Sequence, residues 1–196
     1  MLPIARNEVL GIAAYEEIRP HFRSRVIQLK KSRRVALGNI MTAIFENRDS
    51  VLLQIQEMVR TERLTQESAI AHEIETYNDL IPGPNQLSLT LTIEIAEKEV
   101  RESMLEKLAG LEEKLALVFD GHVSQGQAKD RSVEGIARTT AVHYFKFDLS
   151  AEAVAALARP TVEAKLVCHH PAYPVEVVFN PAVVAQLRED LAAPGS

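Results

Sequence analysis

The stretch that decides the fold runs from residue 46 to residue 84 and reads ENRDSVLLQIQEMVRTERLTQESAIAHEIETYNDLIPGP. Its apolar residues recur at spacings of three and four, which is typical of an amphipathic helix. We predict two helices, over residues 49–63 and 65–80, with a tight turn near Leu64; one bent helix is the alternative. The Pro-Gly-Pro sequence at the end of the stretch predicts where the second helix stops, because a residue before proline is biased away from helical backbone.

The first of these helices has apolar residues on two sides, so its charged residues are expected to be partly buried. Glu57 and Arg60 lie three positions apart and are predicted to pair, since buried charge is costly without a partner. Thr65 is the predicted N-cap of the second helix. Packing the two helices together brings their polar residues into one candidate cluster, which comprises Gln56, Glu57, Arg60, Glu67, Glu73, Tyr77 and Asn78.

Two interpretations of this polar cluster stay open. Carboxylates held near an arginine suit acid–base chemistry, or the binding of an anion or a metal. The alternative is a buried structural network that fixes the register of the two helices. The sequence assigns no catalytic residue within the cluster.

The composition is that of a globular protein expected in the cytoplasm. The 196 residues are 46% hydrophobic and 25% charged, with a net charge of −5. No apolar run approaches the ~20 residues of a membrane span, and a single cysteine, Cys168, fits a reducing compartment. The length predicts one domain over residues 1–192, with a frayed tail over residues 193–196. Tryptophan is absent and aromatic residues are few, so a nucleic-acid partner is not expected.

Positive charge is concentrated near the N-terminus. Residues 19–34 hold seven of the 22 lysine and arginine residues and no acidic residue. A phosphate or an acidic partner suits such a segment, and a solvated helix face that pairs with acids elsewhere is the alternative. Pro20 predicts the start of a helix that runs to about residue 31, separate from one over residues 13–18, because proline suits a first helical turn.

Alternating apolar and polar residues predict the strands. Residues 87–95 alternate most clearly, so one face of that strand packs on a core while the other meets water or polar side chains. Two pairs of segments, 34–37 with 40–46 and 114–119 with 122–125, are predicted to form hairpins around glycine-containing turns. The fold class is therefore α+β: a mainly antiparallel sheet with helices packed on one face.

Two shorter motifs are weaker candidates for a site. Strand alternation puts Cys168 and His170 on one face and His169 on the other, so these three residues do not bind one ion together. Asp49 is a predicted helix cap, and an arginine beside a helix N-terminus, here Arg48, is the geometry of an anion site. The secondary candidates are Arg48, His170 and Tyr173, and no metal or cofactor is predicted.

Four motifs carry a resemblance to a known family: Phe45-Glu46-Asn47-Arg48; Gln54-Ile55-Gln56-Glu57-Met58 with Arg60 and Glu62; Tyr77-Asn78 followed by Leu80-Ile81-Pro82-Gly83; and His170-Pro171-Ala172-Tyr173. Over nearly its whole length the chain resembles the bacterial family catalogued as domain of unknown function 3501. None of these motifs is one of known chemistry. The resemblance does imply a redox or peroxide-stress context, because family members are often encoded beside rubrerythrin-like and iron–sulfur oxidoreductase proteins.

These observations favour an accessory or partner protein in a redox or peroxide-stress system, with a rubrerythrin-like or iron–sulfur oxidoreductase protein as its expected partner. The alternative is an enzyme with an acid–base or anion- or metal-binding site around Glu57, Arg60 and Glu73. We also expect a homodimer, because several strands leave sheet edges, and any apolar sheet face without a helix, to be covered. A membrane is not an expected partner.

Overall fold

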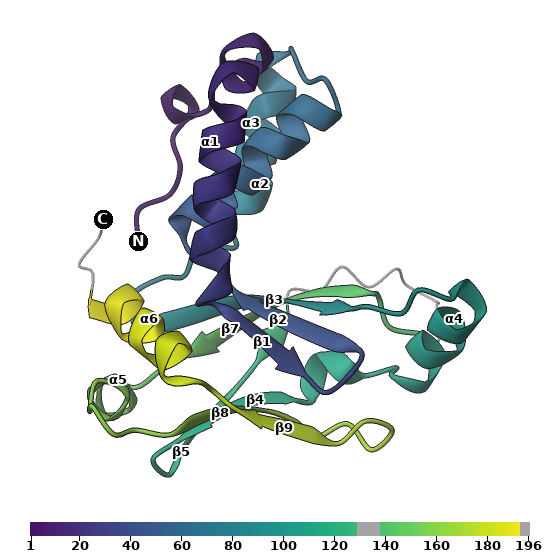
Figure 1. Cartoon of the computed structure of the whole chain (residues 1–196), viewed down its shortest axis with the longest axis vertical. Helices are drawn as coiled ribbons and strands as arrows, with labels where there is room; N and C mark the ends of the chain where they lie inside the picture. The colour runs from purple at the N-terminus through teal and green to yellow at the C-terminus, as the bar shows by residue number, and fades with distance from the viewer. Residues whose placement is uncertain (129–137, 193–196) are drawn as a thin grey trace.

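The computed structural model describes residues 1–128 and 138–192 and shows an α+β protein built from two parts (Figure 1). The helices are η1 (Arg6–Glu8), α1 (Ile12–Lys31), α2 (Arg48–Thr61), α3 (Glu67–Asn78), α4 (Lys98–Lys107), η2 (Leu111–Glu113), α5 (Ala151–Leu157) and α6 (Pro181–Ala192). The strands are β1 (Arg34–Leu37), β2 (Met41–Phe45), β3 (Gln86–Ile93), β4 (Leu115–Phe119), β5 (His122–Gln125), β6 (Gln127–Ala128), β7 (Val142–Asp148), β8 (Ala164–Cys168) and β9 (Val175–Val178). We call η1, α1, α2 and α3 the helical arm, and the remaining elements the β-body.

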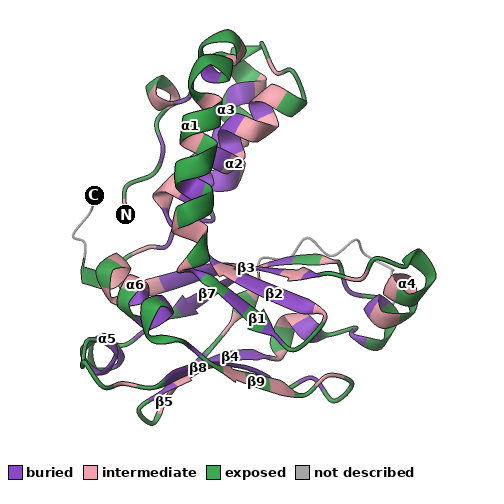
Figure 2. Cartoon of the chain, in the orientation of Figure 1, coloured by how far each residue is buried: buried purple, intermediate pink, exposed green. Residues whose placement is uncertain are grey.

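The β-body contains two antiparallel sheets. Sheet A has the order β1-β2-β3-β7-β6, and sheet B has the order β5-β4-β8-β9. The predicted α+β class with antiparallel strands is confirmed, and the strands divide between two sheets instead of forming one. The inner faces of both sheets share one hydrophobic core. Figure 2 shows the strands of both sheets with long buried stretches. The helical arm stands on the outer side of sheet A, so that face of the sheet meets the lower ends of the arm helices (Figure 1).

Alternation along β3 explains which residues reach the core and which face the arm. Leu91 is fully buried in the core, while Thr90 and Thr92 on either side of it are half-buried on the outer face. β2 lies between β1 and β3, as expected of a strand with apolar residues on both faces. Thr90 is opposite Ile44 of β2 and Tyr144 of β7. The outer face of sheet A is therefore a mixed polar and apolar surface directly below the arm.

Within the arm, α1 packs against α2 and α2 against α3. An apolar cluster separate from the core of the β-body joins α2 and α3 to the N-terminal segment, which contributes Ile4 and Val9. α1 runs unbroken through Pro20, so the predicted division of this helix is wrong. Pro20 and Glu16 are both exposed, so the Glu16 carbonyl that loses its helical partner can bond to solvent.

The turn between α2 and α3 confirms the two-helix prediction. Arg63 adopts a left-handed conformation with φ of 53°, and the Leu64 amide donates to the Val59 carbonyl at 2.9 Å, which closes the helix end. Glycine usually occupies the left-handed position at the end of a helix, so the arginine here gives no sequence signal that α2 ends. Thr65 is not the N-cap: Gln66 holds that position, and its side chain makes no capping bond.

A buried ion pair fastens α6 to the segment that links α1 to β1. The guanidinium of Arg33 donates to both carboxylate oxygens of Asp190 at 2.5 and 2.6 Å, and the two side chains are 1% and 7% exposed. Burial raises the pKa of Asp190, and Arg33 opposes that shift by stabilising the charged form. Asp190 is thus a buried acid whose charge is balanced within the chain.

Part of the polar loop predicted over residues 126–135 is a strand, because β6 pairs with β7. Residues 129–135 of that loop, and the tail predicted to be frayed over residues 193–196, lie outside the described residues. None of the helices in residues 1–128 and 138–192 is long and apolar enough to cross a membrane. The division of the chain into one domain stays a prediction.

Candidate functional site

The two amide side chains of the predicted polar cluster hold the N-terminal segment of the chain. Gln56 accepts from the Leu10 amide at 2.7 Å and donates to the Leu10 carbonyl at 3.2 Å. Asn78 does the same with Ile4, at 2.8 Å and 2.9 Å. Each side-chain amide thus satisfies both the N–H and the C=O of one residue, as a neighbouring strand would. We call these two contacts the N-terminal clasp.

The charged residues of α2 also bind the N-terminal part of the chain rather than each other. Glu57 accepts from the Tyr15 hydroxyl at 2.7 Å and from the Arg19 guanidinium at 2.8 and 3.0 Å. Arg60 donates to Glu16 at 2.6 Å, so the predicted pairing of Glu57 with Arg60 is wrong. Arg19 holds the pKa of Glu57 below its usual range, with the Tyr15 hydroxyl acting in the same direction against burial.

The remaining members of the predicted cluster lie apart. Glu67 forms an exposed bidentate pair with Arg6 of η1, at 2.7 Å for both bonds. Tyr77 is buried in the apolar cluster of the arm. Glu73 makes no hydrogen bond or ion pair with any described residue. The structure therefore brings Gln56, Glu57 and Arg60 to the N-terminal part of the chain, each with a separate partner. These contacts fasten α2 to that part of the chain and do not form one network between α2 and α3.

Arg48 and Asp49 stand at the start of α2 and are likewise held within the chain. Asn47, not Asp49, is the N-cap, because its side chain accepts from the Ser50 amide at 2.9 Å. Asp49 instead binds Arg25 of α1 at 2.9 and 3.1 Å. Arg48 donates to the Glu8 carboxylate at 2.5 Å and to the Leu2 carbonyl at 3.0 Å. An arginine with these partners does not lie free at a helix N-terminus to bind an anion.

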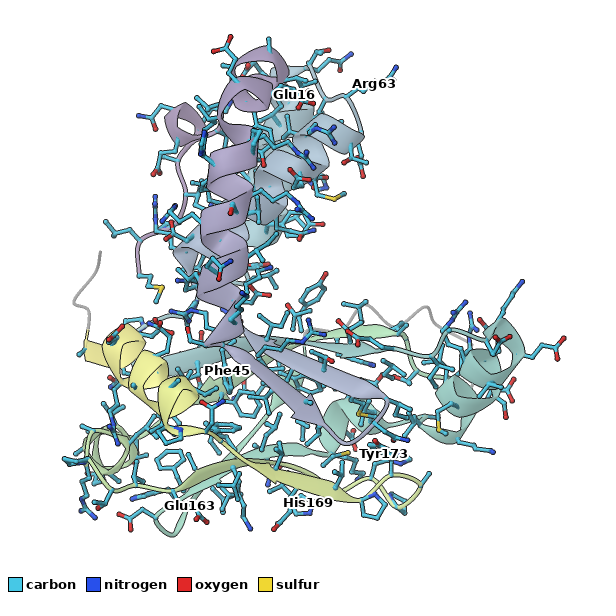
Figure 3. The ribbon with its side chains drawn as sticks, viewed as in Figure 1. Glu16, Phe45, Arg63, Glu163, His169 and Tyr173 are labelled. Atoms are coloured by element: carbon cyan, nitrogen blue, oxygen red, sulfur yellow. The ribbon has the colours of Figure 1, made fainter. Side chains whose placement is uncertain are left out.

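His170 and Tyr173 join three segments of the β-body. The Ala172 amide donates to Nδ1 of His170 at 3.2 Å, so Nε2 carries the proton and donates to the Ala109 carbonyl at 3.1 Å. The Tyr173 hydroxyl bonds to the amide and the side chain of Asn39, both at 2.9 Å, in the tight turn between β1 and β2 (Figure 3). A Cβ at Gly38 would lie 2.0 Å from that hydroxyl, so the turn and Tyr173 fit only with glycine there.

Cys168 lies in the shared core at 1% exposure, and burial raises the pKa of its thiol. His169 beside it is exposed, while His170 is buried, as the alternation of the strand predicted. The described residues contain no group of three or more histidine, cysteine, aspartate or glutamate side chains placed to hold a metal ion.

A pocket that the sequence did not predict lies where the arm meets sheet A. We call it the junction pocket; its volume is about 300 Å³. It is lined by Lys30, Ile44, Glu46, Ser50, Val51, Gln54, Leu80, Thr90, Thr92, Val142 and Tyr144. These residues come from α1, α2, the short segments that precede α2 and follow α3, and the outer face of sheet A. Three of them, Glu46, Gln54 and Leu80, belong to the motifs that carry the family resemblance.

Glu46 is the unusual residue of this pocket. Glu46 is the first residue after β2, and it is 8% exposed. One carboxylate oxygen accepts from the Thr90 hydroxyl at 2.7 Å and the other from the Ser50 hydroxyl. No lysine, arginine or histidine among the described residues forms an ion pair with it. A buried carboxylate that the described residues hold only through hydroxyl groups contrasts with Asp190, whose charge is balanced by Arg33.

Lys30 supplies the positive charge of the pocket. Four other basic residues of the segment 19–34 are paired with acids: Arg19 with Glu57, Arg25 with Asp49, Arg33 with Asp190 and Arg34 with Glu94. Those pairs favour the interpretation of the segment as a charged helix face compensated within the chain. Lys30 is half-buried and forms no ion pair with a described residue. The pocket therefore contains one acidic and one basic side chain that do not neutralise each other.

Only one sequence signal pointed to this pocket. The outward face of residues 87–95 was expected to meet polar side chains, and Thr90 and Thr92 do line the pocket. Glu46 is the last residue of the segment predicted as a strand over residues 40–46, and its spacing gives no indication that it faces the arm. Lys30 and Tyr144 come from segments distant in sequence, and no periodicity connects them.

The fold and this site define an α+β protein in which a helical arm meets a two-sheet body over a polar pocket. The chain belongs to the family described as "Protein of unknown function (DUF3501)", whose family model matches residues 3–191. It is also similar to a crystal structure described as a novel protein of unknown function from Burkholderia pseudomallei K96243. That similarity has a TM-score of 0.90 and 31% sequence identity, and covers 97% of this chain and 100% of the other. No curated protein matches the chain.

Proposed function

We propose that this protein is an accessory protein that acts by binding, with the junction pocket as its functional site. The single observation that carries the proposal is Glu46, a buried carboxylate without a counter-ion among the described residues. Removing such a group from water costs free energy that two hydroxyl contacts only partly offset. A residue that opposes folding in this way is expected where binding requires it.

The position of the pocket favours a regulatory or adaptor role. Its walls come from both the arm and the β-body, so a bound molecule contacts both parts at once. Binding there strengthens the connection between the two parts and stabilises the surface that a partner protein meets. In this proposal the partner belongs to a redox or peroxide-stress system, as the family resemblance implies, with a rubrerythrin-like or iron–sulfur oxidoreductase protein as the first choice.

The test of Glu46 compares its substitution with one at Asp190. Glu46→Gln removes the uncompensated charge and keeps a carbonyl that accepts from Thr90 or Ser50. Its free energy of unfolding is expected to be unchanged, or higher by up to about 2 kcal/mol. Asp190→Asn leaves Arg33 buried without its counter-ion and is expected to unfold at clearly lower urea concentration. If Glu46→Gln is destabilised as strongly as Asp190→Asn, Glu46 is kept for folding and the proposal fails.

Partner binding is tested by sedimentation velocity. The purified protein is mixed with a rubrerythrin-like protein and, separately, with an iron–sulfur oxidoreductase protein from the same source. A faster boundary that contains both components supports the redox partner. If the two components sediment independently at every mixing ratio, the proposed redox partner is excluded. The same experiment on the protein alone tests the proposed homodimer, because a boundary at the 21.8 kDa monomer mass at all concentrations excludes it.

The enzyme alternative was placed at Glu57, Arg60 and Glu73. Glu57 and Arg60 have partners elsewhere in the chain, and Glu73 has no described contact with either residue. These contacts favour the binding proposal over a catalytic cluster at that place.

A further inference from the structure

The junction pocket has features that select a particular kind of ligand. Glu46 presents a carboxylate that uses one hydroxyl donor per oxygen, although a carboxylate can accept about four hydrogen bonds. Lys30 presents an ammonium group with no hydrogen bond or ion pair to the described residues. Both side chains line the same pocket, yet they form no ion pair with each other. One acidic and one basic residue therefore line a shared space.

The rest of the lining limits the size and polarity of the ligand. A volume of about 300 Å³ lies at the small end of ligand pockets, which range from about 300 to 1,000 Å³. Gln54 and Thr92 add an amide and a hydroxyl group beside the two charges. Four aliphatic side chains cover the remaining wall: Ile44, Val51, Leu80 and Val142. Such a pocket fits a small molecule with two opposite charges and a short apolar part.

We propose that the junction pocket binds a free α-amino acid with a small apolar side chain, its ammonium group on Glu46 and its carboxylate on Lys30. A zwitterion supplies the missing counter-charge to both side chains at once, so neither charge stays uncompensated in the complex. A simple amine leaves Lys30 without a partner, and a simple carboxylic acid leaves Glu46 without one. This inference rests on the proposed binding function of the pocket and names its ligand class.

The probes for this proposal are three molecules that share a branched isobutyl group. L-Valine carries both charges, isobutylamine lacks the carboxylate, and isovalerate lacks the ammonium group. Calorimetric titration into the full chain is expected to show binding of L-valine, with isobutylamine and isovalerate at least tenfold weaker. A parallel titration of L-leucine and L-alanine measures how large an apolar group the aliphatic wall accepts.

Four variants locate the binding. Glu46→Gln and Lys30→Met are each expected to weaken L-valine binding at least tenfold. The matched controls are Glu94→Gln, at an exposed acid on the same sheet face, and Lys31→Met, at the residue next to Lys30. Both controls are expected to bind L-valine as the parent does. Equal weakening in Glu94→Gln and Glu46→Gln overturns the proposal, because it places the contact outside the pocket.

The outcomes separate this inference from the proposed function. Binding of isobutylamine as tight as that of L-valine, abolished by Glu46→Gln, overturns the zwitterion and leaves a cation-binding pocket. Tight isovalerate binding abolished by Lys30→Met leaves an anion-binding pocket. If none of the probes binds, the amino-acid ligand is overturned. The proposed function is then decided by the stability of Glu46→Gln: a variant as stable as the parent or more stable supports it, and a strongly destabilised variant overturns it.

Discussion

The N-terminal clasp and the junction pocket both use side chains of α2, yet they treat polar groups in opposite ways. In the clasp, Gln56 satisfies both backbone groups of Leu10, and Asn78 does so for Ile4. In the pocket, Glu46 and Lys30 face one space without an ion pair to any described residue. The first arrangement completes hydrogen bonds within the chain, while the second leaves charge for a molecule from outside.

The difference shows why polar residues in a helix are ambiguous before their partners are known. Gln54 and Gln56 are separated by two positions in one helix, but Gln56 is 2% exposed and bonded on both sides, whereas Gln54 lines the pocket. A polar side chain with complete intrachain bonding stabilises the fold, and its loss is costly. One that lines a pocket without such bonds contributes little to the fold and is available for binding.

The largest expected effect tests the rule on which the comparison depends, that buried charge in this fold needs an internal counter-charge. Arg33→Ala leaves the Asp190 carboxylate, 7% exposed, without its arginine. Breaking a buried pair in this way costs about 3–5 kcal/mol. Urea unfolding measures the loss. Arg34→Ala is the control, because its 3.4 Å contact with Glu94 is exposed and worth about 0–1 kcal/mol. Similar losses in both variants contradict the rule.

The next effect compares the two glutamines directly. Gln56→Ala leaves the partly buried N–H and C=O of Leu10 without protein partners, and the expected loss is up to about 1–3 kcal/mol, the cost of unsatisfied buried groups. Gln54→Ala removes a pocket-lining side chain and is expected to change the free energy of unfolding by about 0.5 kcal/mol or less. Hydrogen exchange adds a local readout, since Gln56→Ala should lose protection at the Leu10 amide first. If the two variants are equally stable, the contrast between a glutamine that stabilises the fold and one that only lines the pocket is wrong.

A smaller effect depends on pH and concerns Glu57. Its pKa is lowered in the folded chain, chiefly by Arg19, so its contribution to stability is present above the unfolded value of 4.5 and is lost as pH falls through the folded value. Glu57→Gln lacks this contribution, so its free energy of unfolding should fall less than that of the parent below about pH 4.5. Glu8 and Glu67, whose pKa values are also lowered, keep part of the acid sensitivity in the variant. Parallel pH curves for parent and variant contradict the assignment.

The local parts of this fold were predictable, and the long-range parts were not. The two helices in residues 46–84 and the hairpin at Gly38 follow from spacing and turn chemistry, which act over a few residues. The clasp joins residues far apart in the sequence: Gln56 and Leu10 are separated by 46 positions, and Asn78 and Ile4 by 74. The helical period of one segment does not reveal which distant backbone groups a glutamine or asparagine will bond. The helix start predicted at Pro20 was wrong for a physical reason: the hydrogen bond that proline cannot make lies on the exposed side of α1, where solvent can replace it.

Arg60 gives the smallest effect and the most direct check on how the two regions are assigned. If it formed a buried network with Glu57 and Glu73, Arg60→Ala would cost about 3–5 kcal/mol. In the structure Arg60 binds Glu16 instead, with the two side chains 33% and 46% exposed, so the expected loss is about 0–1 kcal/mol. Arg60 also lies near enough to Glu57 to lower its pKa slightly, so a small part of the loss should depend on Glu57. A double-mutant cycle of Arg60→Ala with Glu16→Gln measures the pair, and the same cycle with Glu57→Gln should give a smaller coupling energy. A larger coupling to Glu57 than to Glu16 would restore the helical cluster as one network and weaken the contrast with the junction pocket.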